Sequence, residues 1–201
     1  MGKGYLHRLL AVLLATTLVG CFRVSKPDRF YLLRARAEGP AGPATGGPLI
    51  GLEPVRIPPY LDRPQIVTAL SEQEYQLSDR HRWAERLDVS IARVMAENLS
   101  NLLPAAQVVI YPWPREPKPE FQVAIGIREF HIDPEGQARL AALWTLRFAR
   151  APSVSRKFSC RLPASKVDYA RMVEAESQCL ARLSRDIAAA IRHAPGSGAP
   201  E

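Results

Sequence analysis

Two stretches of the chain show the spacing of apolar residues that is typical of amphipathic helices. In residues 83–103, leucine, isoleucine, valine and methionine recur at intervals of three and four positions, which places them on one helical face. Residues 167–191 repeat this spacing from Met172 to Ile191. Pro104 ends the first stretch, because proline cannot continue a helix. We therefore expect two long helices, each with one face available for a core.

The remaining apolar residues mostly alternate with polar ones, as in half-buried strands. The alternation is most regular in residues 121–132 and 138–148. Its parity changes at Arg128–Glu129, which predicts a β-bulge there. The intervening Asp133-Pro134-Glu135-Gly136 matches a type I turn, so the two strands should form a long hairpin. Shorter strand-like runs occupy residues 30–37, 49–57, 65–69, 74–77, 107–111 and 155–162.

The order of these elements predicts an α+β fold. Strands, a helix, four more strands and a last helix fit an antiparallel or mixed β-sheet with the two long helices packed on one face. Residues 30–193 are enough for one well-packed domain and short for two. Residues 38–48 are rich in glycine and proline and should form a surface loop. Residues 194–201 are expected to be a disordered tail.

The N-terminus carries a separate apolar run. Lys3 and Arg8 precede eleven uncharged residues, from Leu9 to Val19. A helix that crosses a bilayer needs about 20 apolar residues, so this run is too short to span. It has the length of the apolar core of a secretory signal.

The run ends in Leu18-Val19-Gly20-Cys21, which resembles the lipobox of bacterial lipoproteins. The resemblance implies that residues 1–20 are a signal peptide, that Cys21 is the lipid-anchor residue, bearing acyl chains such as palmitate, and that residues 21–29 are a tether. Phe22 follows where inner-membrane lipoproteins of enterobacteria carry aspartate, which favours the periplasmic face of the outer membrane over the inner membrane. An ordinary signal peptide with an incidental cysteine is the alternative.

Charge and cysteine content narrow the classes of function. Loss of Lys3 and Arg8 with the leader lowers the formal charge from +7 to +5, and no block of like charges occurs. Nothing therefore indicates binding to nucleic acid. Cys160 and Cys179 would each face the core, on a strand and a helix. In an oxidising compartment they could form a disulfide, or stay as two buried thiols; the sequence leaves both open.

No pattern in the sequence indicates catalysis. A Gly-x-Ser-x-Gly elbow is missing, and no serine, histidine and acid form a recognisable arrangement. His81, His131 and His193 are isolated and lack the spacing of metal ligands. We therefore expect no catalytic residues, no metal and no cofactor.

Two longer stretches resemble a known family. They are Val55–Val67 (VRIPPYLDRPQIV) and Trp83–Leu99 (WAERL, then IARVMAENL). Together with Tyr31-Leu32-Leu33 and Tyr111-Pro112-Trp113, they resemble the ABC-type transport auxiliary lipoproteins, in particular the group related to the paraquat-inducible protein C (PqiC-like). Two positions depart from the family pattern: Ala69 stands where a basic residue is expected, and Arg86 replaces a usual proline.

The resemblance implies a non-enzymatic subunit of an MCE-type lipid-transport system that supports envelope integrity. Its partners would be an MCE-domain tunnel protein, an integral inner-membrane transport component and, through acylated Cys21, the lipid bilayer. The lipoprotein would dock the tunnel at the outer membrane, and copies could assemble into a ring-shaped homo-oligomer. A stand-alone lipid- or solute-binding lipoprotein is the main alternative, and an envelope enzyme is a third.

The stiff segment from Tyr60 to Pro64 is the candidate partner-binding contact. Pro58, Pro59 and Pro64 restrict it, and Tyr60 and Arg63 belong to residue types that are enriched at interfaces. Leu61 and Asp62 complete the candidate. The competing interpretation is a structural crossover, in which Tyr60 and Leu61 cap the core and Asp62 pairs with Arg63. Trp113, in the proline-rich loop 112–119, is a second candidate contact.

Overall fold

The longest strands of the fold form the predicted hairpin. The computed structural model describes residues 27–39, 46–113, 115–148 and 152–194. β6 (Phe121–Ile132) pairs antiparallel with β7 (Gln137–Phe148), and the register shifts between Ile127 and Glu129, which confirms the bulge. Gly136 closes the turn with a φ of +80°, a conformation that residues with a side chain rarely adopt.

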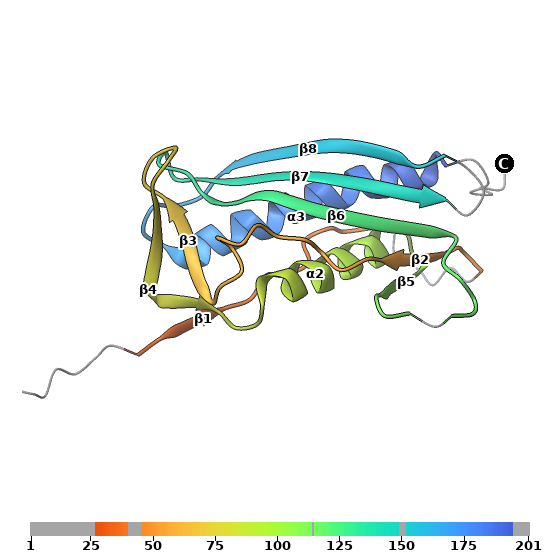
Figure 1. Ribbon diagram of the computed structural model, residues 1–201, viewed down its shortest axis with the longest axis horizontal. Coiled ribbons are helices and arrows are strands. Elements are labelled where there is room, and N and C mark those ends of the chain that lie inside the picture. Colours follow the sequence, from red (N-terminus) through yellow and green to blue (C-terminus); the bar gives the residue numbers. More distant parts are fainter. Residues whose placement is uncertain (1–26, 40–45, 114, 149–151, 195–201) are drawn as a thin grey trace, which may run out of the picture.

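Around this hairpin, the described residues form one mixed sheet of eight strands (Figure 1). On one side of β6 the order runs through β3, β4 and β1 at one end and through β2 and β5 at the other, while β7 and β8 lie on its second side. The α+β class with a mixed sheet is thus confirmed. The other strands are β1 (Arg29–Tyr31), β2 (Leu49–Leu52), β3 (Gln65–Ala69), β4 (Tyr75–Trp83), β5 (Gln107–Ile110) and β8 (Val154–Pro163).

Two helices bury their apolar faces with one side of the sheet. α3 (Tyr169–Arg192) packs along β6, β7 and β8, and α2 (Leu87–Leu102) packs on α3 and β5. The buried residues of both helices join a single core with the inner side of the sheet, so both cover the same face. The Asp168 side chain caps α3 by accepting hydrogen bonds from two backbone amides of its first turn.

The helix predicted from Trp83 begins four residues later, because Trp83 belongs to β4. Its backbone N–H donates to the carbonyl of Pro64, next to β3, at 2.7 Å. β4 is also much longer than the run predicted at 74–77, since the strand continues past a register shift against β3 and its residues 81–83 pair with β1. Cross-strand pairing outweighs the helical periodicity in this part of the chain.

The first strand ends at Tyr31, not near Ala37. Beyond it, side chains of the two helices hold the backbone in place of a strand partner. Asn98, fully buried on α2, accepts hydrogen bonds from the N–H groups of Arg36 and Ala37 at 2.9 and 2.8 Å. Ser177 on α3 accepts from the N–H of Arg34. This segment therefore lies on the helices as an irregular strap.

The strand predicted for 49–57 is regular only as far as Leu52. Pro54 has no N–H to donate, so the pairing with β6 becomes irregular there. The contact resumes at Arg56, whose N–H donates to Ile125 and whose carbonyl accepts from Ile127. Residues 53–57 thus follow β6 and deliver the chain to the proline-rich segment.

α3 is fastened to the sheet by a disulfide and a hydrogen bond. Cys160 of β8 and Cys179 of α3 are joined in a disulfide. Two helical turns further along α3, Asp186 accepts a hydrogen bond from the indole N–H of the fully buried Trp144 at 2.9 Å. The indole thereby satisfies its polar group inside the core. Ala194, expected in the tail, is buried at the end of α3.

Candidate functional site

The proline-rich segment 58–64 is folded as a tight crossover between β6 and β3. The N–H of Leu61 donates to Pro58 at 2.9 Å, and the N–H of Arg63 donates to Leu61 at 2.8 Å. The prolines restrict the backbone further, so the segment has little conformational freedom to lose on binding.

Tyr60 is half-buried on the sheet, against the side chain of Tyr75 in β4. The ring centroids lie 5.1 Å apart, and the Tyr60 hydroxyl donates to the carbonyl of Arg128 at 3.4 Å. Burial, together with the nearby Tyr75 and Glu129, raises the pKa of Tyr60 to about 12. Its phenol therefore stays protonated and able to donate at any pH near neutrality.

Leu61 is only 2% exposed and belongs to the core, which removes it from the candidate surface. Asp62 is exposed and lies 4.0 Å from Arg86, so the ion pair considered between Asp62 and Arg63 does not form. Arg63 is half-buried, and its Nε is enclosed without a hydrogen-bond partner among the described residues. The segment thus presents Tyr60, Asp62 and Arg63 and anchors itself through Leu61.

A cavity of about 310 Å³ opens beside this segment. Asp62, Arg63 and Pro64 form one wall, and residues 83–87 form the other. Arg86, which replaces the proline of the family pattern, stands at its rim and pairs with Asp88 at 2.9 Å. This pair raises the pKa of Arg86 and lowers that of Asp88. The opening of α2 therefore carries a charged pair where a proline would carry none.

The second predicted contact, Trp113, does not lie with the first. It is half-buried, packs edge-on against the exposed Tyr111 at 5.3 Å, and covers Gly51 of β2. A Cβ on Gly51 would come within 3.1 Å of the Trp113 ring, so this position has no room for a side chain. β2 and β5 lie at the opposite end of the sheet from the β3–β4 hairpin, next to which Tyr60 packs (Figure 1).

A cleft that the sequence did not predict separates the β3–β4 hairpin from the β6–β7 turn. β3 pairs with β6 only at Thr68 and Ile132, and residues of both hairpins line a space of about 450 Å³. The cleft is lined by Ala69, Ser71, Glu72, Tyr75, Glu129, His131, Asp133, Pro134, Glu135, Arg139 and Arg161.

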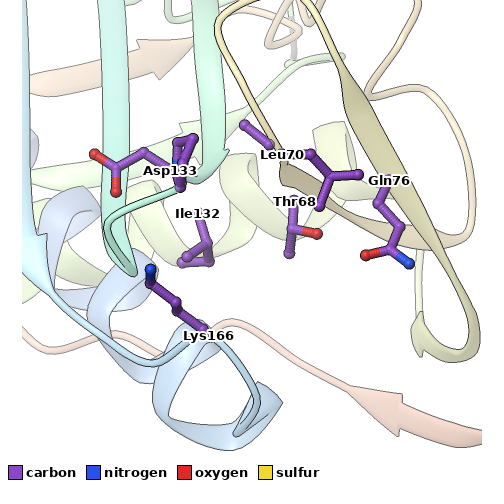
Figure 2. Close-up of a pocket in the computed structure, with 8 residues that line it drawn as sticks. Thr68, Leu70, Gln76, Ile132, Asp133 and Lys166 are labelled. Carbon is purple, nitrogen blue, oxygen red and sulfur yellow. The ribbon is translucent and has the colours of Figure 1, made fainter.

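A smaller pocket of about 150 Å³ adjoins the cleft and shares three of its residues, Ala69, Asp133 and Pro134. Figure 2 shows Ile132, Asp133 and Lys166 on one side of this pocket and Thr68, Leu70 and Gln76 on the other. The stem of Lys166 packs against Gly136, where a Cβ would come within 2.9 Å of it.

Two acids of the cleft are compensated by arginines from neighbouring strands. Asp133 is 3% exposed, and its Oδ1 accepts hydrogen bonds from the N–H groups of Glu135 and Gln137. Its Oδ2 lies 3.2 Å from the guanidinium of Arg161. Glu129 pairs in the same way with Arg139, at 3.4 Å.

His131 lies between these pairs, 5% exposed, and its Nδ1 has no hydrogen-bond partner in the described chain. Burial lowers the pKa of His131, and Arg139 lowers it further, against the opposing effects of Glu129 and Asp133. The imidazole is therefore neutral near pH 7. The rings of His131 and Tyr75 are nearly perpendicular, with their centroids 5.3 Å apart.

The sequence contained one signal for this cleft. The bulge at 128–129 moves Glu129, His131 and Asp133 onto the side of β6 that faces away from the helices, where the hairpin register sets His131 opposite Arg139. Treating His131 as isolated missed this grouping. The position of the β3–β4 hairpin, which supplies the other wall, had no such signal.

Cys21 lies outside the described residues. In the described ranges, no three His, Cys, Asp or Glu side chains are grouped as a metal site. No helix in the same ranges has the length and apolar character needed to cross a membrane.

The family model of the ABC-type transport auxiliary lipoprotein component matches residues 31–188. The chain therefore belongs to this family of transport auxiliary lipoproteins, which is not a recognised class of enzyme, and the predicted resemblance is confirmed. The intermembrane transport lipoprotein PqiC of Escherichia coli K12 is 23% identical over 191 residues, which cover 94% of this chain and 100% of the relative. The protein of the same name from Shigella flexneri matches equally.

Solved structures share the fold. The crystal structure of an uncharacterized protein superposes with a TM-score of 0.70 at 24% identity, covering 83% of this chain and 99% of the other. Protein XCC0632 from Xanthomonas campestris superposes with a TM-score of 0.67 at 16% identity, covering 81% of this chain and 94% of the other. The arrangement of helices and sheet described above is thus also found in crystal structures.

Proposed function

We propose that this protein is a non-enzymatic adaptor of an MCE-type lipid-transport system, anchored through acylated Cys21 to the periplasmic face of the outer membrane. The observation that carries the proposal is the family match over residues 31–188. The name of the Escherichia coli relative, an intermembrane transport lipoprotein, agrees with it. The adaptor would receive the far end of a tunnel protein, whose own base meets an integral inner-membrane component.

The sequence places the folded domain close to the proposed anchor. Arg29, the first residue of β1, lies eight positions after Cys21. At about 3.3 Å per extended residue, the domain would stand no more than about 26 Å from the lipid. Two or more acyl chains hold a protein stably on a bilayer, whereas one does so only marginally. An acylated Cys21 would therefore keep the domain within reach of a tunnel that ends at this membrane.

The surface proposed for the tunnel protein is the segment that presents Tyr60, Asp62 and Arg63. It is stiff, it combines an aromatic ring with charges of both signs, and a cavity of about 310 Å³ opens beside it. Rigid contacts lose little entropy on binding, and tyrosine and arginine are frequent at the centres of interfaces. Several copies arranged in a ring would repeat this surface around the tunnel end.

Crosslinking in membranes, followed by capture of the full-length protein, tests the proposal. The expected result is recovery of an MCE-domain protein. Asp62→Lys should reduce the recovery strongly, and Glu97→Lys, an equal change of charge at an exposed position of α2, should leave it intact. Cys21→Ala should release the domain from the membrane or leave an uncleaved precursor.

Two outcomes would contradict this function. If Cys21→Ala still fractionated with the membrane as the unaltered protein does, Cys21 would not be the anchor. Recovery of a monomer that carries lipid released by organic extraction, without a tunnel protein, would instead support a stand-alone lipid-binding lipoprotein.

A further inference from the structure

The cleft between the β3–β4 hairpin and the β6–β7 turn is acidic on a basic protein. The whole chain has a formal charge of +7, yet four acids and two arginines line this cleft. Arg139 and Arg161 are engaged with Glu129 and Asp133. The uncompensated negative charge of the cleft therefore lies on the other two acids, Glu72 and Glu135.

Glu72 and Glu135 stand on opposite walls of the cleft. Glu72 belongs to the β3–β4 hairpin and Glu135 to the β6–β7 turn, and the two hairpins lie at the same end of the sheet (Figure 1). Both side chains are exposed, and neither forms an ion pair with any residue that the structure describes. Two uncompensated carboxylates on facing walls favour a cation between them.

Aromatic rings connect the cleft to the segment proposed to dock the tunnel protein, which presents Tyr60, Asp62 and Arg63. His131 and Tyr75 both line the cleft, and Tyr75 in turn packs on Tyr60 at 5.1 Å. Tyrosine faces attract ammonium and guanidinium groups. His131 is neutral near pH 7 because burial lowers its pKa, so it does not repel a cation. It also keeps its enclosed Nδ1 without a partner in this part of the chain.

Beside the acids, the same hairpin exposes apolar side chains. Leu70 is 51% exposed, and Tyr75 and Leu77 are each 40% exposed. Exposed apolar groups next to a charged cleft are typical of a protein contact, in which apolar neighbours exclude water from the central pair. A lipid headgroup would bring a phosphate toward Glu72 and Glu135, which would repel it. The surroundings thus favour a protein over a headgroup.

We infer that this cleft receives a lysine or arginine side chain of a partner protein, with apolar residues on either side of it. The basic group would lie between Glu72 and Glu135 and against Tyr75, while its neighbours would cover Leu70 and Leu77. In identifying the partner as the docked transport component, the inference rests on the proposed function. The cleft itself can be tested without that component.

The test uses the full-length protein in detergent and a labelled peptide, acetyl-Leu-Arg-Leu-amide, followed by fluorescence anisotropy. The expected result is saturable binding that weakens with added salt. Replacement of arginine by its neutral analogue citrulline should weaken binding about tenfold. Glu72→Gln with Glu135→Gln should do the same, and Glu97→Gln should leave the affinity unchanged. Unfolding midpoints in urea that match the unaltered protein would show that the variants remain folded.

Each contrary result overturns the inference. Equal binding of the citrulline peptide would mean that only the apolar rim contributes. An affinity unchanged by Glu72→Gln and Glu135→Gln would place the site elsewhere. Displacement of the peptide by glycerophosphoethanolamine at a lower concentration than by arginine amide would assign the cleft to a lipid headgroup.

The two proposals can fail separately. If the peptide does not bind but membrane crosslinking recovers an MCE-domain protein, only the cleft assignment is wrong. If the peptide binds as described and no such protein is recovered, the cleft stands as a site for a basic side chain and the proposed function fails.

Discussion

Two regions of the molecule bury a carboxyl group, and they treat it in opposite ways. At the end of the β6–β7 hairpin, Asp133 is 3% exposed, and its Oδ1 accepts hydrogen bonds from two backbone N–H groups. Its Oδ2 forms an ion pair with Arg161 at 3.2 Å, although without the geometry of a hydrogen bond. In the first half of α3, Glu176 is 1% exposed, and its Oε2 is enclosed without a hydrogen-bond partner in the described residues. Burial raises the pKa of Glu176 to about 8.

The two carboxyl groups therefore differ in role: that of Asp133 stabilises local structure, whereas that of Glu176 has no such structural role. Asp133 is an acceptor that shapes the turn and so fixes one wall of the cleft. Glu176 is neutral near pH 7, because an ionised carboxylate without a partner would cost several kcal/mol inside the core. Burial alone therefore does not identify a functional acid. The hydrogen-bond and ion-pair partners of the buried carboxyl group determine its role.

The largest expected effect concerns Glu176. Its pKa is about 4.5 in the unfolded chain and about 8 in the folded one, so the folded state binds more protons between these values. The free energy of unfolding should therefore fall by a few kcal/mol as the pH rises from about 5 to about 8, and then level off. Glu176→Gln should flatten this decline. Urea unfolding at unit steps from pH 5 to 9 measures it.

The neighbouring Glu174 provides the matched control. It is paired with Arg36 on the surface, and that pair lowers its pKa, so Glu174→Gln should leave the decline in place. A decline of equal size in Glu176→Gln and the unaltered protein would mean that the α3 carboxyl does not titrate in this range.

The second largest effect concerns the disulfide that joins α3 to β8. The disulfide between Cys160 and Cys179 closes a loop with a sequence separation of 19, and a loop of this size stabilises the fold by about 3 kcal/mol. Cys160→Ala with Cys179→Ala should lower the unfolding free energy by about that amount. Mass spectrometry after alkylation should find both thiols protected in the unaltered protein. Two alkylated thiols there would contradict the pairing.

The two regions also differ in how far the sequence could predict them. The β6–β7 hairpin, its bulge and α3 could be predicted because each has a long, unbroken periodicity that one local rule explains. Trp83 shows the limit of that approach. Its apolar ring fits the helical spacing of α2, but its backbone bonds to Pro64, nineteen residues earlier in the chain. A local sequence pattern cannot predict a hydrogen bond between residues this far apart in the chain.

The candidate sites show the same limit more strongly. Tyr60 and Leu61 are adjacent in the sequence and were predicted together, yet Tyr60 is only half-buried against the core, whereas Leu61 lies inside it. The cleft combines a hairpin at residues 69–75 with strands from residue 129 onward. Only the register of β6 against β7 could be foreseen, because the single β3–β6 bridge at Thr68 and Ile132 depends on how the whole sheet closes.

The third prediction tests whether Asp133 builds the cleft wall. Asp133→Ala removes two backbone hydrogen bonds and the partner of Arg161, so the unfolding free energy should fall by about 2 kcal/mol. Glu135→Ala, in the same turn but exposed, should change it by less than about 0.5 kcal/mol. Thermal or urea unfolding at pH 7 measures both. An equal loss of unfolding free energy in the two variants would mean that the side chain of Asp133 does not stabilise the turn.

The smallest effect is expected at Tyr60, where the cleft meets the docking segment. Tyr60→Phe removes one long hydrogen bond to Arg128 from a half-buried hydroxyl and keeps the ring against Tyr75, so the loss should be about 0.5 kcal/mol or less. In a spectrophotometric titration, Tyr60→Phe should remove the tyrosine that ionises last, since its pKa is raised to about 12. If the last ionisation persists in this variant, the phenol of Tyr60 is not held against the sheet, and the rigid surface that joins cleft and segment is lost with it.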